Sequence, residues 1–177
     1  EGADLIDVGG ESTRPGAKEV EVEEEIRRVI PVISKIRELF EIPVSIDTYK
    51  AKVAKEALEA GVDMVNDISG LRFDPGLKEV VARSGAAVVL MHIKGTPRDM
   101  QNNPRYESLM EEIISYLSES IRLAQKAGID LEKIIIDPGI GFGKTSQHNL
   151  QILNHLGELR SLGRPILIGA SRKSFIG

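Results

Sequence analysis

Polar side chains stand at the ends of several short apolar runs in the sequence. Asp47 closes the segment PVSID, Asn66 and Asp67 close VND, and Asp137 follows three consecutive isoleucines. A carboxylate can accept two parallel hydrogen bonds from neighbouring N–H donors. Two carboxylates and an amide from three strand ends therefore indicate a site for a flat heterocycle with N–H donors along its edge. They do not form an obvious set of metal ligands.

Each of these residues also has a purely structural interpretation. Asp47, Asn66 or Asp67 could cap the helix that follows it, because Asp and Asn are favoured at helix N-caps. Neighbouring side chains on a strand point to opposite faces, so at most one of Asn66 and Asp67 can point into a barrel. Asp137 precedes Pro138, which holds it extended and disfavours the capping role.

The segment DPGIGFGK, residues 137–144, resembles a phosphate-binding loop but does not match its spacing. The P-loop pattern requires glycine five residues before Gly143, where this chain has Pro138. The dinucleotide fingerprint also fails, because the three glycines alternate strictly. The segment is then either a flexible strand-to-helix loop, or a loop whose glycines bring the backbone close to a ligand beside Asp137. Lys144 has no expected role beyond the start of the next helix.

Cationic residues lie in two further loops. Arg14 stands before Pro15 in GGESTRPGA and could meet an anion, or could be an ordinary exposed loop arginine. Arg172 and Lys173 precede Ser174, which could open a helix and offer its hydroxyl and backbone N–H groups to a carboxylate or phosphate. His92 ends the run VVLMH, where a hydrogen-bonded structural role is expected.

The elements that must position these residues alternate regularly. Strands are expected at residues 5–8, 44–46, 64–68, 87–91, 134–136 and 166–168. Helices are expected at about residues 22–40, 50–60, 75–83, 104–127 and 147–162, the last four ending near glycines. The alternation indicates an α/β fold. The long connection at residues 94–103 suggests a functional loop.

A doubly wound sheet and a TIM-type (β/α)₈ barrel both fit this alternation. The polar strand ends favour the barrel, which collects its site from many strands, whereas a doubly wound sheet uses one switch point. A barrel usually needs about 250 residues. We therefore expect residues 1–177 to be a single barrel domain with about six of the eight βα units, truncated at both ends.

Composition excludes several classes of protein. The chain has no cysteine, so disulfides, thiol catalysis and thiolate metal sites are excluded. A formal net charge of −4 makes a broad nucleic-acid surface unexpected. No apolar run has the length of a membrane span, so we expect no membrane partner and a cytoplasmic location.

Six ordered motifs carry a resemblance that spans essentially the whole chain. They are DLIDVGGESTRPGA, PVSIDTYK, VNDISG, LMHIKGTPRDMQ, DPGIGFGK and GASRKSFIG. The chain resembles the dihydropteroate synthases of the pterin-binding barrel family. The resemblance implies condensation of para-aminobenzoate with hydroxymethyl-dihydropterin pyrophosphate in folate biosynthesis, sensitivity to sulfonamides, Mg²⁺ as cofactor and a homodimer.

The resemblance also implies roles for individual residues. Arg14 and Lys173 would be catalytic. The pterin would contact Asp47, Asn66, Met91, Asp137, Phe142 and Lys173. The aminobenzoate end would involve Thr13, Pro15, Arg172 and Ser174, with Gly169 also at the substrate. The family's Mg²⁺ ligand would lie in a first loop that these residues do not include, and its pyrophosphate-binding last strand is also absent, so we expect this chain alone to be poorly active.

Three alternatives remain open at this stage. A generic phosphate-binding barrel enzyme would place a glycine loop after its later strands, but it would not explain Asp47, Asn66 and Asp137. A methyltransferase domain that binds methyl-tetrahydrofolate would share the pterin floor, which is Asp47, Asn66 and Asp137. It would not account for the motifs STRPGA and SRKS. A non-catalytic pterin-binding paralogue would show damage at Asp47, Asn66, Asp137, Arg14 or Lys173, and all five are intact.

Overall fold

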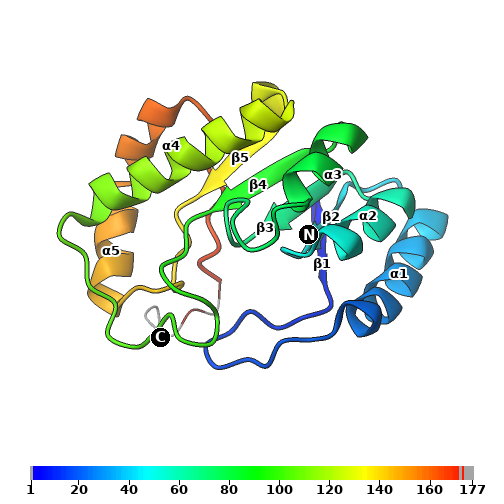
Figure 1. The fold of residues 1–177 in the computed structure, drawn as a ribbon, viewed down its shortest axis with the longest axis horizontal. Coiled ribbons are helices and arrows are strands. Elements are labelled where there is room, and N and C mark those ends of the chain that lie inside the picture. The colour runs from blue at the N-terminus through cyan, green and yellow to red at the C-terminus, as the bar shows by residue number, and fades with distance from the viewer. Residues whose placement is uncertain (1, 172, 174–177) are drawn as a thin grey trace.

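The chain folds around one parallel sheet, described in a computed structural model for residues 2–171 and 173. Its five strands are β1 (Ile6–Gly9), β2 (Val44–Asp47), β3 (Met64–Asp67), β4 (Ala87–Met91) and β5 (Ile134–Asp137). They lie side by side in chain order, and every neighbouring pair is parallel (Figure 1).

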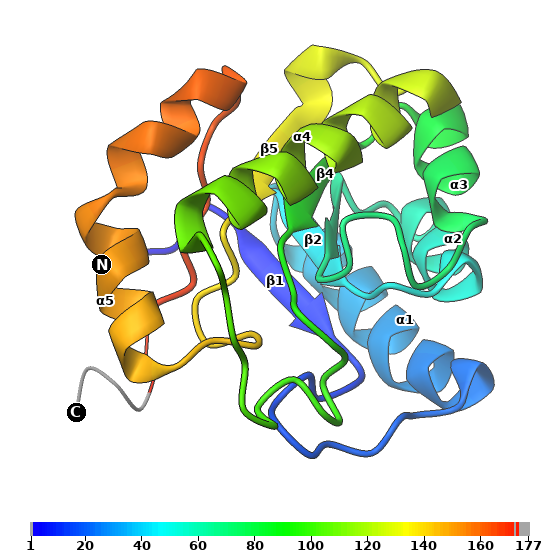
Figure 2. The same ribbon diagram turned by 60° about the vertical axis from the view of Figure 1, so that its left-hand side comes forward.

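A helix follows each strand. The helices are α1 (Val22–Leu39), α2 (Ala51–Glu59), α3 (Leu77–Ser84), α4 (Leu109–Ala127) and α5 (Ser146–Asn154), and short 3₁₀ turns form η1 (Leu131–Lys133) and η2 (Leu156–Leu162). They wrap the outside of the sheet in the order of the chain (Figure 2). Because the strand order never reverses, the sheet has no switch point. The fold is a partial (β/α)₈ barrel, and the doubly wound alternative is wrong.

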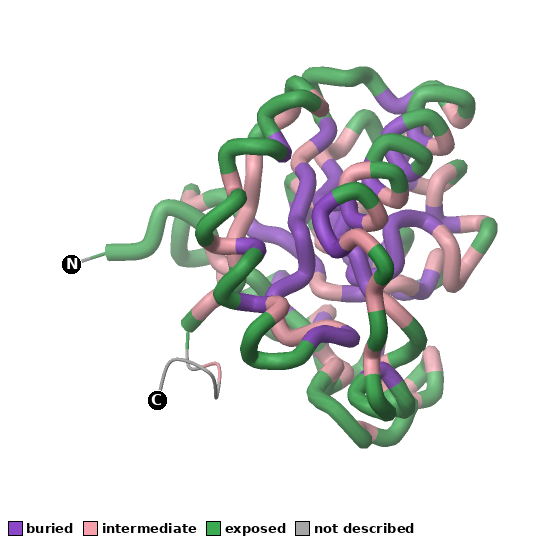
Figure 3. The backbone as a smooth tube through the Cα atoms, turned by 90° about the vertical axis from the view of Figure 1, so that its left-hand side faces the viewer, coloured by how far each residue is buried: buried purple, intermediate pink, exposed green. Residues whose placement is uncertain are grey.

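The two faces of the sheet have different chemistry. One row of register partners lies on the helix-covered face and is buried: Val8, Ile46, Val65, Val88 and Ile134. The next row points to the inner face: Gly9, Asp47, Asn66, Val89 and Ile135. The apolar core therefore lies between sheet and helices (Figure 3), and the polar strand ends face the barrel interior.

Helix ends follow the glycines closely, but two helices differ from expectation. Gly85, Gly128 and Gly163 adopt left-handed conformations with φ of 68°, 97° and 63°. The fourth helix begins at Leu109 and not near residue 104, because the Glu112 carboxylate accepts the N–H of Glu107 at 2.8 Å and holds the preceding segment as a loop.

The last expected helix is divided. α5 ends at Asn154, and the chain continues as the 3₁₀ segment η2. Gly157 lies at this point and weakens a continuous α-helix.

The expected sixth strand at residues 166–168 is wrong. This segment meets β5 through a single bridge between Ile136 and Ile166, with hydrogen bonds from Ile136 to Pro165 O (3.0 Å) and from Leu167 to Ile136 O (2.8 Å). Pro165 has no N–H to extend the ladder. No helix in the described part of the chain is long and apolar enough to cross a membrane.

Candidate active site

The predicted polar residues meet at the carboxyl ends of the strands. Asp47 of β2 and Asn66 of β3 are direct register partners on the inner face. Asp137 ends β5, and its register partner on β4 is Met91. The sheet therefore places the two carboxylates, the amide and an apolar side chain on one concave face, as the sequence predicted.

Asn66 and Asp67 separate as expected for neighbouring strand residues. Asn66 Nδ2 donates to Asp7 Oδ2 at 3.2 Å on the inner face. Asp67 is fully buried on the helix side, where its Oδ1 accepts the N–H and the hydroxyl of Ser69, both at 2.8 Å. Asn66 alone belongs to the site, and Asp67 shapes the turn after β3.

Asp7, a polar residue in the first expected strand, was given no binding role from the sequence but lies on the same inner face. Its Oδ1 accepts the hydroxyl of Ser45 at 2.5 Å, and its Oδ2 holds Asn66. The available signal was strand alternation, because Asp7 lies two residues before Gly9 and so shares its face. Asp7 orients the amide of Asn66 toward the inner face.

Asp47 does not cap a helix. The first N–H of α2, at Ala51, donates to Asp74 at 2.7 Å, so the capping interpretation of Asp47 is wrong. Its Oδ1 is buried and has no hydrogen-bond partner among the described residues. Burial, with the nearby charge of Asp7 next in importance, raises the pKa of Asp47 to about 7. This oxygen is available to an N–H donor of a ligand.

Asp137 lies almost fully buried at the end of β5. Its Oδ1 accepts the N–H of Gly139 at 2.6 Å. Burial raises the pKa of Asp137 to about 6, against the opposing effects of that N–H and of Lys144 and Lys173. The cap of α5 is Thr145, whose side chain accepts the N–H of His148 at 3.2 Å, so Asp137 is not a helix cap either.

The segment 137–144 is held firmly, and its glycines mostly face protein. A Cβ at Gly139 would lie 1.9 Å from the carbonyl oxygen of His92, and one at Gly143 would lie 2.4 Å from that of Lys94. The N–H of Gly141 donates to Asn149 at 2.9 Å. The flexible-loop interpretation is therefore wrong, and so is the ligand-approach interpretation for Gly139 and Gly143.

Lys144 also departs from its expected minor role. Its side chain is 2% exposed and its Nζ lies 2.8 Å from Nδ1 of His92, so it points into the protein. An amino group in this position does not reach out to a phosphate, which excludes the nucleotide-loop interpretation. His92 is buried and hydrogen-bonded, as expected for a structural residue.

A cavity of about 690 Å³ brings together the predicted residues of three loops. Its lining includes Thr13, Arg14, Pro15, Phe142 and Lys173. Lys173 Nζ lies 4.5 Å from the centre of the Phe142 ring, within the range of a cation–π contact. Burial lowers the pKa of Lys173, Asp137 opposes that effect, and Arg14 adds to it. Cations therefore gather at one end of the site.

An apolar cluster adjoins Asp137, whose register partner on β4 is Met91. Met91 is 4% exposed and packs with Ile68, Ile93 and Met100, and Phe142 lies against this cluster. Gly169 is exposed, and no atom lies within 4 Å of the position of a Cβ on it. Arg172 and Ser174 lie outside the described residues.

A family model described as pterin binding enzyme matches residues 1–177 of this chain. The chain belongs to this family. Two similar relatives are the dihydropteroate synthases of Synechocystis, 51% identical, and Clostridium beijerinckii, 53% identical; each match covers 99% of this chain. The chain spans 61% and 63% of the length of these relatives.

Solved structures agree with this family membership. A Yersinia pestis dihydropteroate synthase in a sulfonamide complex superposes with a TM-score of 0.96 at 46% identity, covering 99% of this chain and 64% of its own. The Clostridium difficile enzyme, solved with pteroic acid, gives 0.93 at 50% identity and 99% and 65% coverage. The Xanthomonas albilineans enzyme, solved with 4-aminobenzoic acid, gives 0.93 at 49% identity and 99% and 62% coverage.

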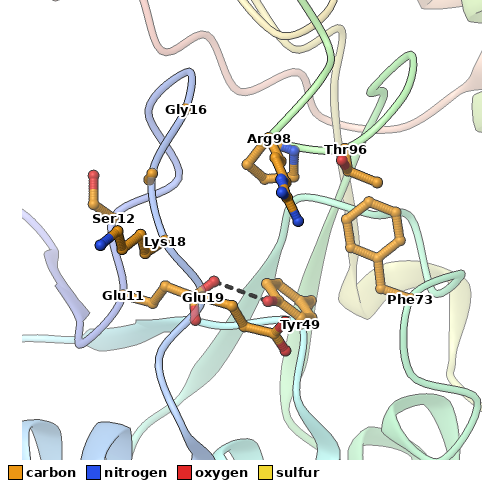
Figure 4. A pocket seen from close by; sticks show the side chains of 11 residues that line it. Glu11, Ser12, Gly16, Lys18, Glu19, Tyr49, Phe73, Thr96 and Arg98 are labelled. Carbon is orange, nitrogen blue, oxygen red and sulfur yellow. Dashed lines mark hydrogen bonds between the residues drawn. The ribbon is translucent and has the colours of Figure 1, made fainter.

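A second cavity, of about 700 Å³, lies beside the pterin-family site (Figure 4). Tyr49 and Phe73 meet edge to face in its wall at 5.4 Å, and the Tyr49 hydroxyl donates to Glu11 at 2.8 Å. The loops after β1 and β4 close over it, joined by a hydrogen bond from Gly16 to Pro97 O at 3.0 Å. None of the residues predicted to bind substrate lines this cavity.

A buried ion cluster anchors the loop that carries Arg14. Lys50 Nζ lies 2.7 Å from Glu11 and 2.8 Å from Glu25, and the three side chains are at most 8% exposed. Glu11 directly precedes the loop, so the cluster fixes where the loop leaves β1. This role has no local sequence signal, because the partners lie far apart in the chain.

Proposed function

We propose that the intact protein is a dihydropteroate synthase, which transfers the pterinylmethyl group of hydroxymethyl-dihydropterin pyrophosphate to para-aminobenzoate. The observation that carries the proposal is the position of Lys173. Its amino group lies over the Phe142 ring, its charge acts on Asp137, and it shares a cavity with Arg14. One residue thus connects a floor suited to a pterin with an anion-binding end.

The floor suits the edges of a pterin ring. Asp47 offers a buried oxygen without a partner in the described chain, and Asp137 has one oxygen held by Gly139. A pterin presents neighbouring N–H donors that such carboxylates can accept. Asn66, oriented by Asp7, adds an amide that can donate and accept. Met91 and Phe142 provide apolar surface for the ring faces.

The adjoining cavity suits the second substrate and the departing phosphate. Thr13, Arg14 and Pro15 line it together with Lys173. The two cations favour a carboxylate or phosphate there. The Xanthomonas relative was solved with 4-aminobenzoic acid and the Clostridium difficile relative with pteroic acid, ligands that match these two regions.

The reaction requires mainly that the enzyme orients the two substrates. The amine nitrogen of para-aminobenzoate attacks the methylene carbon, the carbon–oxygen bond to pyrophosphate breaks, pyrophosphate leaves with the electron pair, and the nitrogen releases one proton. The amine is already a competent nucleophile, so no strong base is required. Asp47, Asn66 and Asp137 would hold the ring, while Arg14 and Lys173 stabilise the developing negative charge.

Three other properties implied by the resemblance remain proposals. Mg²⁺ commonly neutralises pyrophosphate, but residues 2–171 and 173 contain no group of three His, Asp or Glu side chains that could hold a metal ion. A homodimer is tested by sedimentation of the intact protein, and a cytoplasmic location by fractionation of cells that express it.

The direct experiment is formation of dihydropteroate by the intact natural protein, with and without Mg²⁺. We expect dihydropteroate and pyrophosphate in equal amounts, and less of both when Mg²⁺ is removed. Absence of product together with binding of methyl-tetrahydrofolate would support the methyltransferase alternative. Pterin binding without any turnover would support a non-catalytic paralogue.

A further inference from the structure

Lys144 is a buried lysine whose hydrogen-bond acceptors are all neutral, and burial lowers the pKa of its amino group to about 7, against the opposing charge of Asp137. Its Nζ lies 2.8 Å from His92 Nδ1, 2.9 Å from the carbonyl oxygen of Phe142 and 3.4 Å from that of His92. No carboxylate in the described chain forms an ion pair with it. Burying an ammonium group in this way is costly. The pairing with His92 and Phe142 therefore needs a reason beyond packing.

His92 is placed to accept this hydrogen bond. It follows β4 directly, its N–H donates to the Asp137 carbonyl at 2.9 Å, and its ring meets the edge of Tyr116 at 4.7 Å. Burial, followed by the charge of Lys144, holds the pKa of His92 far below its ordinary value, so the ring is neutral. With Nδ1 accepting from Lys144, the ring proton is assigned to Nε2.

The hydrogen bond between Lys144 and His92 joins residues 137–144 to residues 92–94, which lie in direct contact. Gly139 and Gly143 leave no room for a Cβ against the backbone of His92 and Lys94. Tyr106 adds a hydrogen bond from its hydroxyl to the Gly143 carbonyl at 2.7 Å. Lys144 crosses this contact, because it bonds the His92 ring on one side and the Phe142 carbonyl on the other.

Two residues of the segment 137–144, Asp137 and Phe142, belong to the proposed pterin site. Asp137 begins the segment, and Phe142 lies under the amino group of Lys173. The charge of Lys144 also lowers the pKa of Asp137, against the larger effect of burial. The titratable groups that act on Lys144 are Asp137, Lys173 and Lys94, and its bonded partner is His92.

We propose that Lys144 is a positioning residue for the pterin: through His92 and the Phe142 carbonyl it fixes residues 137–144 on the end of β4, so that Asp137 and Phe142 meet the same ligand. The inference rests on the proposed function. Lys144 acts on the pterin through its neighbours, and its main effect is on pterin affinity, because Asp137 serves that ligand alone; the effect on aminobenzoate, which shares only Phe142, is smaller.

The test compares single variants of the intact protein. Lys144→Met should raise the KM for pterin pyrophosphate about tenfold or more and leave the KM for para-aminobenzoate within about twofold. Lys133→Met, which removes a lysine from the exposed end of η1 just before β5, should change neither. His92→Asn retains an acceptor near the position of Nδ1 and should stay close to the unaltered protein, whereas His92→Leu should resemble Lys144→Met.

Two further readouts separate positioning from general loss of structure. The acid limb of pterin binding should move to higher pH in Lys144→Met, because Asp137 loses a neighbouring cation while Lys173 remains. The double variant Lys144→Met with His92→Leu should lose less affinity than the product of the single losses. If Lys144→Met does not fold, the KM values for pterin pyrophosphate of His92→Asn and His92→Leu test the proposal. Equal values in these two variants would overturn it.

The outcomes distinguish this inference from the proposed function. Equal pterin affinity in the unaltered protein and Lys144→Met, or equal weakening for both substrates, would overturn the positioning role alone. No pterin binding by the unaltered protein would overturn the proposed function and this inference together.

Discussion

Asp47 and Asn66 are register partners on neighbouring parallel strands, and they meet on the inner face of the sheet with the Asp47 Oδ1 atom lacking any partner in the described chain. This arrangement is unfavourable for the protein alone. A carboxylate oxygen that is buried without a hydrogen bond, as Asp47 Oδ1 is in the described part of the chain, destabilises the native state unless a ligand supplies a donor. The pair is therefore best understood as prepared for a ligand.

Asp47→Asn should stabilise the free protein at pH 8 while removing pterin affinity. The folded-state pKa of about 7 lies above the ordinary value, so the charged group destabilises the native state at pH 8 and this effect disappears as pH falls toward 4. We expect a gain of about 1–3 kcal/mol at pH 8. Urea unfolding at both pH values measures it. Asp63→Asn, at an exposed carboxylate paired with Arg37, should show no such gain; a loss of stability in Asp47→Asn would contradict the interpretation.

Gly139→Ala should strongly destabilise the protein. The added methyl group would lie 1.9 Å from the His92 carbonyl oxygen, at a residue whose φ is +69°. We expect a loss of about 3 kcal/mol or more, measured by thermal or urea unfolding. Gly157→Ala is the control, because nothing lies within 4 Å of its Cβ position, and its effect should stay within about 0.5 kcal/mol. Similar stability of the two variants would show that the segment does not pack on His92 as described.

Lys50→Met should cost far more stability than Lys52→Met. Lys50 is buried between Glu11 and Glu25, whereas Lys52, two residues later in α2, forms an exposed ion pair with Glu23 of α1. Removal of the buried cation leaves two uncompensated carboxylates, at a cost of about 3–5 kcal/mol. Loss of the exposed pair should have little effect, because solvent screens it. Denaturant unfolding gives both values. Equal costs would mean that the cluster does not anchor the loop that carries Arg14.

A sulfonamide should compete with para-aminobenzoate in the intact protein. Such a drug imitates the aminobenzoate ring, and the proposed site for that ring lies in the cavity lined by Arg14, Phe142 and Lys173. Inhibition should raise the KM for para-aminobenzoate and leave the maximal rate unchanged. Absence of competition would favour the methyltransferase alternative.

The sequence predicted the sheet and the polar strand ends well, because both depend on local patterns. Apolar runs and terminal glycines located the strands and helices, and strand alternation correctly separated Asn66 from Asp67. The prediction of a sixth strand was wrong because the sequence does not show which strand lies beside Pro165. With β5 as its neighbour, the segment forms only a single bridge. The polar pattern indicated the site but did not decide whether Asp47 caps the next helix. The hydrogen bond from the Ala51 N–H to Asp74 decided it.

Other parts of the site depend on contacts between distant segments. Lys144 looks from sequence like the start of a helix, and only the approach of residues 137–144 to residues 92–94 shows why it is buried. Glu11 and Lys50 are likewise 39 residues apart. Neither pairing has a local sequence signal, so neither could be predicted without the fold.

Calorimetric titration of hydroxymethyl-dihydropterin pyrophosphate into the intact protein tests the central claim most directly. We expect binding at pH 8 that weakens at least tenfold by pH 5, because Asp137 and Asp47, with pKa values of about 6 and about 7, must be ionised to accept the N–H donors. Asp137→Ala should abolish binding. Unchanged affinity in Asp137→Ala, or affinity that does not fall between pH 8 and pH 5, would contradict the assignment of this face as a pterin site.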